Sequence, residues 1–294
     1  MSSFPSAYRL ALATSDVIPA LHPDDTHLAL SLQRLGIEPS ACVWSDPGID
    51  WSRFDAVLIR TTWDYFQRYA EFQAWLDRLP IPTINEQRLL QWNSDKRYLV
   101  ELERQGVDIV PTRVATAAGL RDALDAMAGR AVVVKPTVSG GAWHTLQGVV
   151  GEVAFEQGVA QLPRSLDYLV QPFLPEILSA GEWSLLYFGG AFSHAVLKRA
   201  AAGDYRVQGI FGGSTEAIEP DAPIRASAQR ALDAVVAIGH AQASYARVDG
   251  VVVDGRFLLM ELEMIEPLLF LAERPDAAER FAQCVRERLE QIVK

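Results

Sequence analysis

The chain has 294 residues, which is enough for one large domain or for two to three smaller ones. Hydrophobic residues make up 49% of it and charged residues 22%, which is typical of a folded globular protein and excludes disorder along its whole length. The net charge of −10 repels phosphate backbones, so we expect no nucleic acid partner.

Neither the cysteines nor the apolar segments indicate export or a membrane. Cys42 and Cys284 are the two cysteines and lie outside any CxxC spacing, which fits a reducing compartment. The first residues show no basic region followed by an apolar run, and no stretch approaches ~18 uninterrupted apolar residues. We therefore expect a cytoplasmic protein with no membrane partner.

The first part of the chain alternates short apolar runs with helical patterns, which predicts an α/β unit. Pro23 starts a helix that Gly36 ends, and Pro80 ends a second helix over residues 66–79. The expected strands are residues 9–14, 41–44 and 55–60.

The remainder predicts further strands and helices, and the class as a whole is α/β or α+β. We expect helices at 93–105, 224–241 and near the C-terminus, and strands at 131–136, 169–174, 183–188, 248–253 and 257–262. The dipeptide Asp254–Gly255 lies between the last two strands and is typical of a tight hairpin turn.

Three carboxylates gather on this expected hairpin. Side chains alternate along a strand, so Glu261 and Glu263 point to one face, and folding at the turn brings Asp249 near them. Buried carboxylates are costly unless paired, and Mg²⁺ prefers such oxygen ligands and shares them with nucleotide phosphates. The alternative is an amphipathic hairpin with one solvated acidic face.

Basic residues beside small-residue loops suggest contacts with phosphate. Lys135 ends a valine-rich strand, and the loop after it contains Ser139, Gly140 and Gly141, where backbone N–H groups are accessible. Lys96, at the start of a helix, is a second candidate phosphate contact or an ordinary surface lysine. A further loop contains Gly212 and Gly213. It follows Lys198, Arg199 and Arg206, which form either an anion site or a solvated cluster.

The order of these features resembles the ATP-grasp superfamily of carboxylate–amine ligases. The stretches LVQPFLPEI and GEWSLLYF look most like bacterial glutathione synthetases, and ARVDGVVVDGRFLLMELE is similar to a segment of D-alanine–D-alanine ligases. The blocks IRTTWDY and QWNSDKRYL resemble ligases linked to D-cycloserine biosynthesis. The resemblance spans residues 55–270.

The resemblance implies an ATP-grasp fold in which two lobes clamp the nucleotide. Residues 1–90 would form an N-terminal preATP-grasp domain, residues 91–170 the small lobe with its glycine-rich lid, and residues 171–294 the C-terminal lobe with the metal site. A homodimer is one assembly that it implies.

The resemblance also implies roles for individual residues. Lys96 and Lys135 would contact the ATP phosphates under a lid of Ser139, Gly140 and Gly141. In the inter-lobe linker from Gln171, backbone groups of Phe173 and Leu174 would read the adenine edge, and Glu182 would bind the ribose. The remaining implied roles are Mg²⁺ binding (one ion or two, or Mn²⁺) by Asp249, Glu261 and Glu263, and stabilisation of the transferred phosphoryl group by Arg247, helped by Lys198 or Arg206.

Many relatives have Asn where this chain has Glu263, so the ligand set differs there. In addition, Glu266–Pro267 is followed by Leu268, Leu269 and Phe270, in a stretch where ligases of small amino acids often carry polar or small residues, so the resemblance does not transfer a substrate.

A candidate acceptor pocket follows the strand at 55–60. Ligands of open α/β sheets bind beyond the carboxyl ends of strands, where Arg60 would take a carboxylate and Asp64 an ammonium group. The alternative is a packed aromatic turn around Trp63 and Tyr65.

The function that we expect is an ATP-dependent ligase. A small carboxylate substrate would form an acylphosphate, and an amine would then displace phosphate to give an amide. The alternatives are an ATP-grasp enzyme that modifies a peptide or protein, and a nucleotide-binding module without catalysis.

Overall fold

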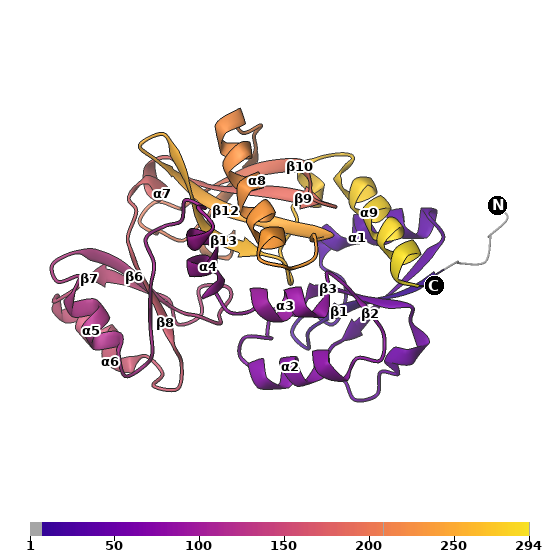
Figure 1. Cartoon of the computed structure of the whole chain (residues 1–294), viewed down its shortest axis with the longest axis horizontal. Coiled ribbons are helices and arrows are strands. Elements are labelled where there is room, and N and C mark those ends of the chain that lie inside the picture. Colours follow the sequence, from indigo (N-terminus) through magenta and orange to yellow (C-terminus); the bar gives the residue numbers. More distant parts are fainter. Residues whose placement is uncertain (1–7, 208, 294) are drawn as a thin grey trace.

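The computed structural model describes residues 8–207 and 209–293, which form three sheets arranged along the long axis of the molecule (Figure 1). The described part confirms the mixed α/β class that the sequence predicts. None of its helices is long and apolar enough to cross a membrane.

The first sheet is parallel and has the strand order β2–β1–β3–β4. Helices cover both faces of this sheet and pack against its apolar side chains. On one face, the C-terminal helix α9 lies beside α1 (Figure 1). Chain ends far apart in sequence therefore share one core. The elements are β1 (Tyr8–Thr14), α1 (Pro23–Arg34), β2 (Ile37–Val43), β3 (Ala56–Thr61), α2 (Tyr69–Arg78), β4 (Thr83–Ile84) and α9 (Ala277–Ile292).

The second sheet is antiparallel and has the order β5–β8–β6–β7. Two short helices cover one face of it, and their apolar residues close a small core of their own. The elements are β5 (Arg113–Ala115), α5 (Leu120–Asp125), β6 (Ala131–Pro136), β7 (Leu146–Val149), α6 (Val153–Gln161) and β8 (Tyr168–Pro172).

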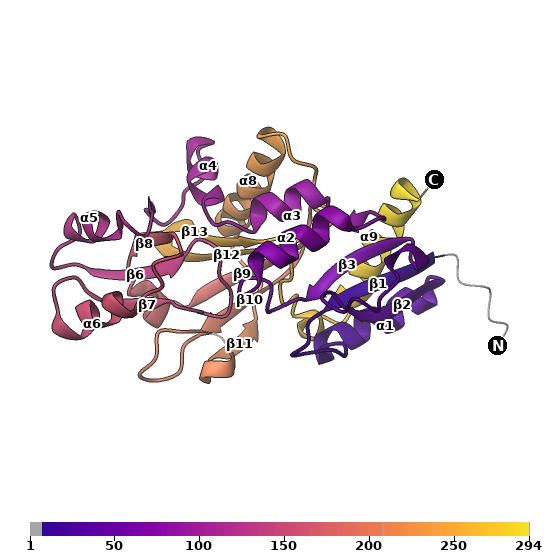
Figure 2. The ribbon, with the colours of Figure 1, turned by 90° about the horizontal axis from the view of Figure 1, so that it is seen from below.

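The third sheet lies in the middle of the molecule and has the order β11–β10–β9–β12–β13. Helices α4 and α8 cover one face of it, as both views show (Figures 1 and 2), and Leu99, Leu232 and Val248 meet in the largest core. The elements are α3 (Gln87–Asn93), α4 (Tyr98–Arg104), α7 (Glu176–Ser179), β9 (Glu182–Phe188), β10 (Ala191–Arg199), β11 (Ser214–Ala217), α8 (Ala222–Ala237), β12 (Tyr245–Val253) and β13 (Arg256–Glu263).

The hairpin between β12 and β13 is confirmed. Asp254 and Gly255 both have positive φ angles, 48° and 76°, which a two-residue hairpin turn of this kind requires. The single helix expected over 93–105 is wrong, because α3 ends at Asn93 and α4 begins at Tyr98. The Asn93 side chain donates to the Leu262 carbonyl and accepts from the Met264 N–H, so it fixes the break against the third sheet.

Candidate active site

The central group of charges lies on β12 and β13. Asp249 lies opposite Glu261 and Arg247 lies opposite Glu263 in the strand register, so the four side chains occupy neighbouring positions of the sheet. The guanidinium group of Arg247 reaches both acids, at 2.8 Å from Asp249 and 2.5 Å from Glu263. The approach of the carboxylates that the hairpin pattern predicts is therefore observed, with Arg247 between them.

A second cation approaches Asp249 from the neighbouring strands. The ammonium group of Lys198 on β10 lies 2.5 Å from Glu182 and 3.8 Å from Asp249, and the Ser184 hydroxyl donates to Asp249. Lys198 and Arg247 lower the pKa of Asp249 below its usual value, although its burial alone acts in the opposite direction. Asp249 is therefore a carboxylate, held by two cations and a hydroxyl.

Glu182, expected at the ribose, is buried beside Lys198, and its burial raises its pKa. Sequence reasoning missed Ser184, since a serine in an apolar strand carries no motif.

Two more lysines lie close to these carboxylates, one from the second sheet and one from the turn before α4. The ammonium group of Lys96 lies 3.2 Å from Glu261 and donates to the Ser139 carbonyl. Burial lowers the pKa of Lys135, which the nearby Lys96 lowers further and the nearby Glu261 raises. The two lysines and Glu261 therefore lie close together where the second and third sheets meet, and this place is called the cleft below.

The use of lysine in this chain is concentrated in that cleft. The chain has four lysines, and Lys96, Lys135 and Lys198 are three of them; the fourth is Lys294, outside the described residues. Exposed cationic positions of the described part are arginines. Lysine presents a compact charge with rotatable donors, which suits phosphate oxygens.

Two glutamates beside the cluster have raised pKa values. Burial raises the pKa of Glu263 to about 7, with Glu261 and Asp249 adding to the effect and Arg247 opposing it. Burial and the neighbouring Glu263 raise the pKa of Glu266 to about 8. Sequence reasoning did not single out Glu266 as a site residue, because it follows β13 in a segment without regular structure. A cation that enters the cleft would lower the pKa of both carboxyl groups, because it favours their charged form.

The expected lid loop lies over this cleft. Ser139 is buried and its hydroxyl donates to the Pro136 carbonyl, while Gly141 has a positive φ of 56°. A Cβ atom on Gly140 would lie 2.7 Å from the ring of Phe66, so glycine is needed for close contact with the first sheet's loop. The loop therefore bridges two parts of the molecule.

The expected linker between the lobes runs out of β8. The Gln171 side chain donates to the Thr112 hydroxyl at 2.8 Å. The Phe173 N–H donates to the Ala131 carbonyl, and the Leu174 carbonyl accepts from Ile177. The Phe173 N–H and the Leu174 carbonyl are therefore used in hydrogen bonds within the protein. The backbone groups that remain as candidates for binding adenine are the Phe173 carbonyl and the Leu174 N–H.

Arg206 differs from the expectation. Its guanidinium group pairs with Asp204 at 2.7 Å and lies 3.6 Å from the centre of the Phe211 ring, so it has partners within its own loop. A Cβ atom on Gly213 would lie 2.1 Å from the Val207 carbonyl oxygen, which explains this glycine by packing. Gly212 has a positive φ of 81°, a turn conformation.

The acceptor pocket expected at Arg60 and Asp64 also differs. Arg60 is 1% exposed, pairs with Asp25 at 2.8 Å and donates to the Pro267 carbonyl. Asp64 accepts a hydrogen bond from the Trp44 indole at 2.8 Å. Both side chains are thus held inside the protein, and the packed turn is the better description.

The three carboxylates do not form a metal site by themselves. Within residues 8–207 and 209–293, no three His, Cys, Asp or Glu side chains stand together as a ready metal site. Asp249, Glu261 and Glu263 each have a basic partner instead. Mg²⁺ usually takes one or two carboxylates together with substrate phosphates, so the residues fit a metal that arrives with the nucleotide.

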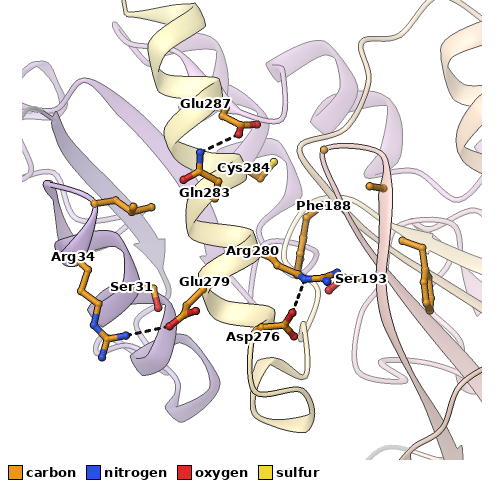
Figure 3. Close-up of a pocket in the computed structure, with 14 residues that line it drawn as sticks. Ser31, Arg34, Phe188, Ser193, Asp276, Glu279, Arg280, Gln283, Cys284 and Glu287 are labelled. Atoms are coloured by element: carbon orange, nitrogen blue, oxygen red, sulfur yellow. Dashed lines mark hydrogen bonds and ion pairs between the residues drawn. The ribbon is translucent and has the colours of Figure 1, made fainter.

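A cavity of about 830 Å³ lies elsewhere, between α1, α9 and the β9–β10 turn (Figure 3). Charged residues that line it form ion pairs: Arg34 lies 3.4 Å from Glu279, and Arg280 lies 2.7 Å from Asp276. None of the site residues expected from the sequence lines it. Size alone therefore does not make it the site of chemistry.

Comparison with known proteins agrees with this geometry. A family model for the N-terminal domain of D-cycloserine synthetase DcsG matches residues 10–85. The cycloserine biosynthesis protein DcsG of Streptomyces lavendulae is 34% identical over 300 residues, covering 95% of this chain and 98% of that protein.

Solved structures show the same relationship. The crystal structure of D-cycloserine synthetase DcsG has a TM-score of 0.85 at 34% identity and covers 96% of this chain and 99% of its own. A D-alanine–D-alanine ligase of Bacillus anthracis complexed with ATP shares the fold, with a TM-score of 0.65 at 17% identity, covering 97% of this chain and 98% of its own. The chain therefore belongs to the DcsG family of ATP-grasp ligases.

Proposed function

We propose that this ATP-grasp ligase joins a carboxylate to an amine on small amino-acid-like substrates, through an acylphosphate. The observation that carries the proposal is the cleft in which Lys96 and Lys135 face Glu261 and Asp249. Family membership supplies the class of enzyme, and these groups supply the charges that phosphoryl transfer from ATP needs.

The lysines and Arg247 would divide the electrostatic work. Lys96 and Lys135 would bind the transferred phosphoryl oxygens while the substrate carboxylate attacks the γ-phosphate and ADP leaves. Arg247 would then stabilise the oxyanion that forms when the amine attacks the acyl carbon and phosphate departs. Lys198 holds Glu182 and Asp249 in place, so we assign it a supporting role.

Mg²⁺, or Mn²⁺ in its place, would be held by Asp249, Glu261 and Glu263. When bound, the ion neutralises charge on the phosphates. Glu261 pairs with Lys96 and Glu263 pairs with Arg247, so the residues that would hold the ion are also those that hold the two cations proposed to meet phosphate and substrate.

The proposed function also assigns a part of the work to each proposed domain. We propose that residues 91–170 and 171–294 close on ATP from two sides, with the adenine at the linker after Gln171 and the ribose at Glu182. The loop of Ser139, Gly140 and Gly141 would exclude water from the acylphosphate, which hydrolyses readily if exposed. Residues 1–90 would complete the substrate side.

The relative's name narrows the substrate. D-cycloserine is a ring closed by an amide bond, and opening that bond gives a carboxylate and an aminooxy nitrogen in one small amino acid. Direct closure of such a ring would take both reacting groups from a single molecule. We propose the same intramolecular class as the first substrate to test for this chain.

The test is turnover of ATP by the purified chain. It is incubated with ATP, Mg²⁺ and, separately, a 3-aminooxy amino acid, pairs of amino acids and short peptides, and ADP, phosphate and the organic product are measured. Stoichiometric ADP, phosphate and amide from a small substrate support the proposal. Turnover with peptides only would make it a peptide-modifying enzyme. ATP binding without turnover on any substrate would make it a non-catalytic module.

A further inference from the structure

The segment directly after β13 has an unusual set of hydrogen bonds. Residues 264–270 belong to no helix or strand, yet each of their carbonyl groups accepts a hydrogen bond from a side chain elsewhere in the protein. In chain order from Met264 to Phe270, the donors are Asn85, Tyr245, Trp63, Arg60, Arg247 and, for the last two carbonyls, His194, at distances of 2.7–3.1 Å.

These donors come from the first sheet with its loops and from the third sheet. Arg60 and Trp63 belong to the first sheet and its following loop, and Arg247 belongs to the carboxylate cluster on β12. A carbonyl group held by a hydrogen bond fixes its peptide plane, and the peptide plane sets the direction of the neighbouring side chains. The segment is therefore a rigid wall between the first sheet and the cluster, although it has no regular structure.

Side chains of this wall alternate in exposure. Pro267 and Leu269 are buried behind it, whereas Glu266, Leu268 and Phe270 are partly exposed. The ring centre of Phe270 lies 5.9 Å from the guanidinium carbon of Arg247, so the partly exposed face of the wall lies next to the carboxylate cluster on β12 and β13.

Glu266 is the only charged residue of the wall, and it has no cationic partner of its own. No ion pair joins it to a Lys, Arg or His among the described residues, in contrast to Asp249, Glu261 and Glu263. Glu266 follows Glu263 by three residues and is partly exposed, as is Phe270, whose ring lies beside Arg247, and the charges of Glu263, Lys96 and Glu261 act on its carboxyl group. A carboxylate there repels the phosphates of ATP and attracts a cation.

We propose that Glu266 binds the α-ammonium group of the amino-acid-like substrate and so sets which end of that substrate meets Arg247. This rests on the proposed function and adds the group that recognises the substrate. The wall holds the carboxylate at a fixed place, so an ammonium group bound there positions the substrate's carboxyl group toward the lysines and Arg247. The raised pKa agrees with a carboxyl group that lacks a partner until substrate arrives.

The test compares Glu266→Gln with the unmodified enzyme, using a substrate that turns over and its analogue with hydrogen in place of the ammonium group. Loss of a charge-assisted hydrogen bond predicts a rise in KM for the amino substrate of about 10- to 100-fold, with KM for ATP unchanged. With the unmodified enzyme, KM for the analogue should be higher than KM for the amino substrate by a similar factor. With Glu266→Gln, KM for the analogue should rise no further. Glu266→Asp, which keeps the charge, should lie between the two.

Glu287→Gln is the matched control, because Glu287 lies on α9 at the remote cavity (Figure 3) and its kinetics should not change. The proposal is overturned if Glu266→Gln still prefers the amino substrate as strongly as the unmodified enzyme does. It is also overturned if the variant changes only the Mg²⁺ requirement, which would make Glu266 a metal ligand. Failure of the unmodified enzyme to turn over any substrate would instead overturn the proposed function.

Discussion

The ammonium group of Lys96 lies 3.2 Å from the carboxylate of Glu261, and this ion pair joins the turn before α4 to strand β13. One partner is our candidate for the ATP phosphates and the other is our candidate for Mg²⁺. The two charges of this pair balance each other before the nucleotide binds, and Mg²⁺ and phosphate would each replace one side of it. Each buried side chain would then exchange one partner of opposite charge for another.

Glu261→Gln should raise the Mg²⁺ concentration needed for half-maximal turnover by about tenfold or more, because a neutral amide is a weaker ligand for a hard cation. ATP turnover measured against Mg²⁺ concentration checks this. The control is Glu216→Gln on the exposed strand β11, which should leave the requirement as it is. An unchanged requirement in Glu261→Gln would remove this residue from the metal site.

Arg247→Ala should destabilise the fold by about 3–5 kcal/mol, because it leaves the buried carboxylate of Asp249 without its main partner. Urea unfolding followed by circular dichroism measures the loss. Arg247→Ala combined with Asp249→Asn should recover part of it, since the second change removes the unpaired charge. If the double variant is as unstable as the sum of the single variants, the two side chains do not stabilise each other.

The raised pKa of Glu263, about 7, predicts a pH dependence of stability. In the unfolded chain this carboxyl has its usual pKa near 4.5, so between these two values the folded state holds more protons than the unfolded state. The free energy of unfolding should therefore contain a favourable contribution that is present below about pH 4.5 and is lost as the pH rises through about 7.

Urea unfolding at about pH 5 and about pH 8 without divalent ions tests this contribution. Glu263→Gln should reduce the stability lost between the two values, because the amide does not titrate. An equal loss in both proteins would show that Glu263 is not the titrating group.

Gly140→Ala should disturb the loop over the cleft, because the added Cβ atom would lie 2.7 Å from the Phe66 ring. We expect KM for ATP to rise by several-fold, since the loop can no longer rest against the first sheet. Phe66→Leu in the same chain should restore much of the affinity by making room. Gly129→Ala, at a turn with open space but a positive φ of 72°, tests whether backbone strain at a glycine has the same effect without a side-chain clash. No change in Gly140→Ala would separate the loop from ATP binding.

Much of the fold was predictable because it is encoded locally. Short apolar runs identified β1, β3, β6, β9, β12 and β13, and Pro23 and Asp254–Gly255 marked a helix start and a turn. The break between α3 and α4 was not predictable, since it depends on Asn93 binding Leu262, a residue far along the chain. Short β4, β5 and β7 carry too few residues for a periodic signal.

The candidate site was predictable to the extent that charged residues stood in apolar strands. Lys135, Arg247 and Asp249 are such residues, and their cost of burial points to partners. Arg60 followed the same rule but pairs with Asp25, which the sequence does not reveal. The importance of Glu266 depends on the carbonyl contacts of its neighbours, and these arise only in the folded chain.

Amine labelling in the presence and absence of Mg²⁺ and ATP tests the central claim most directly, because the chain has only four lysines. Burial lowers the pKa of Lys135, which increases the fraction of free amine that a small acylating reagent can modify, and mass spectrometry reports each site. We predict that Mg²⁺ with ATP suppresses labelling at Lys135 while Lys294 reacts as before. Equal labelling of Lys135 with and without saturating Mg²⁺ and ATP would contradict an ATP site in this cleft.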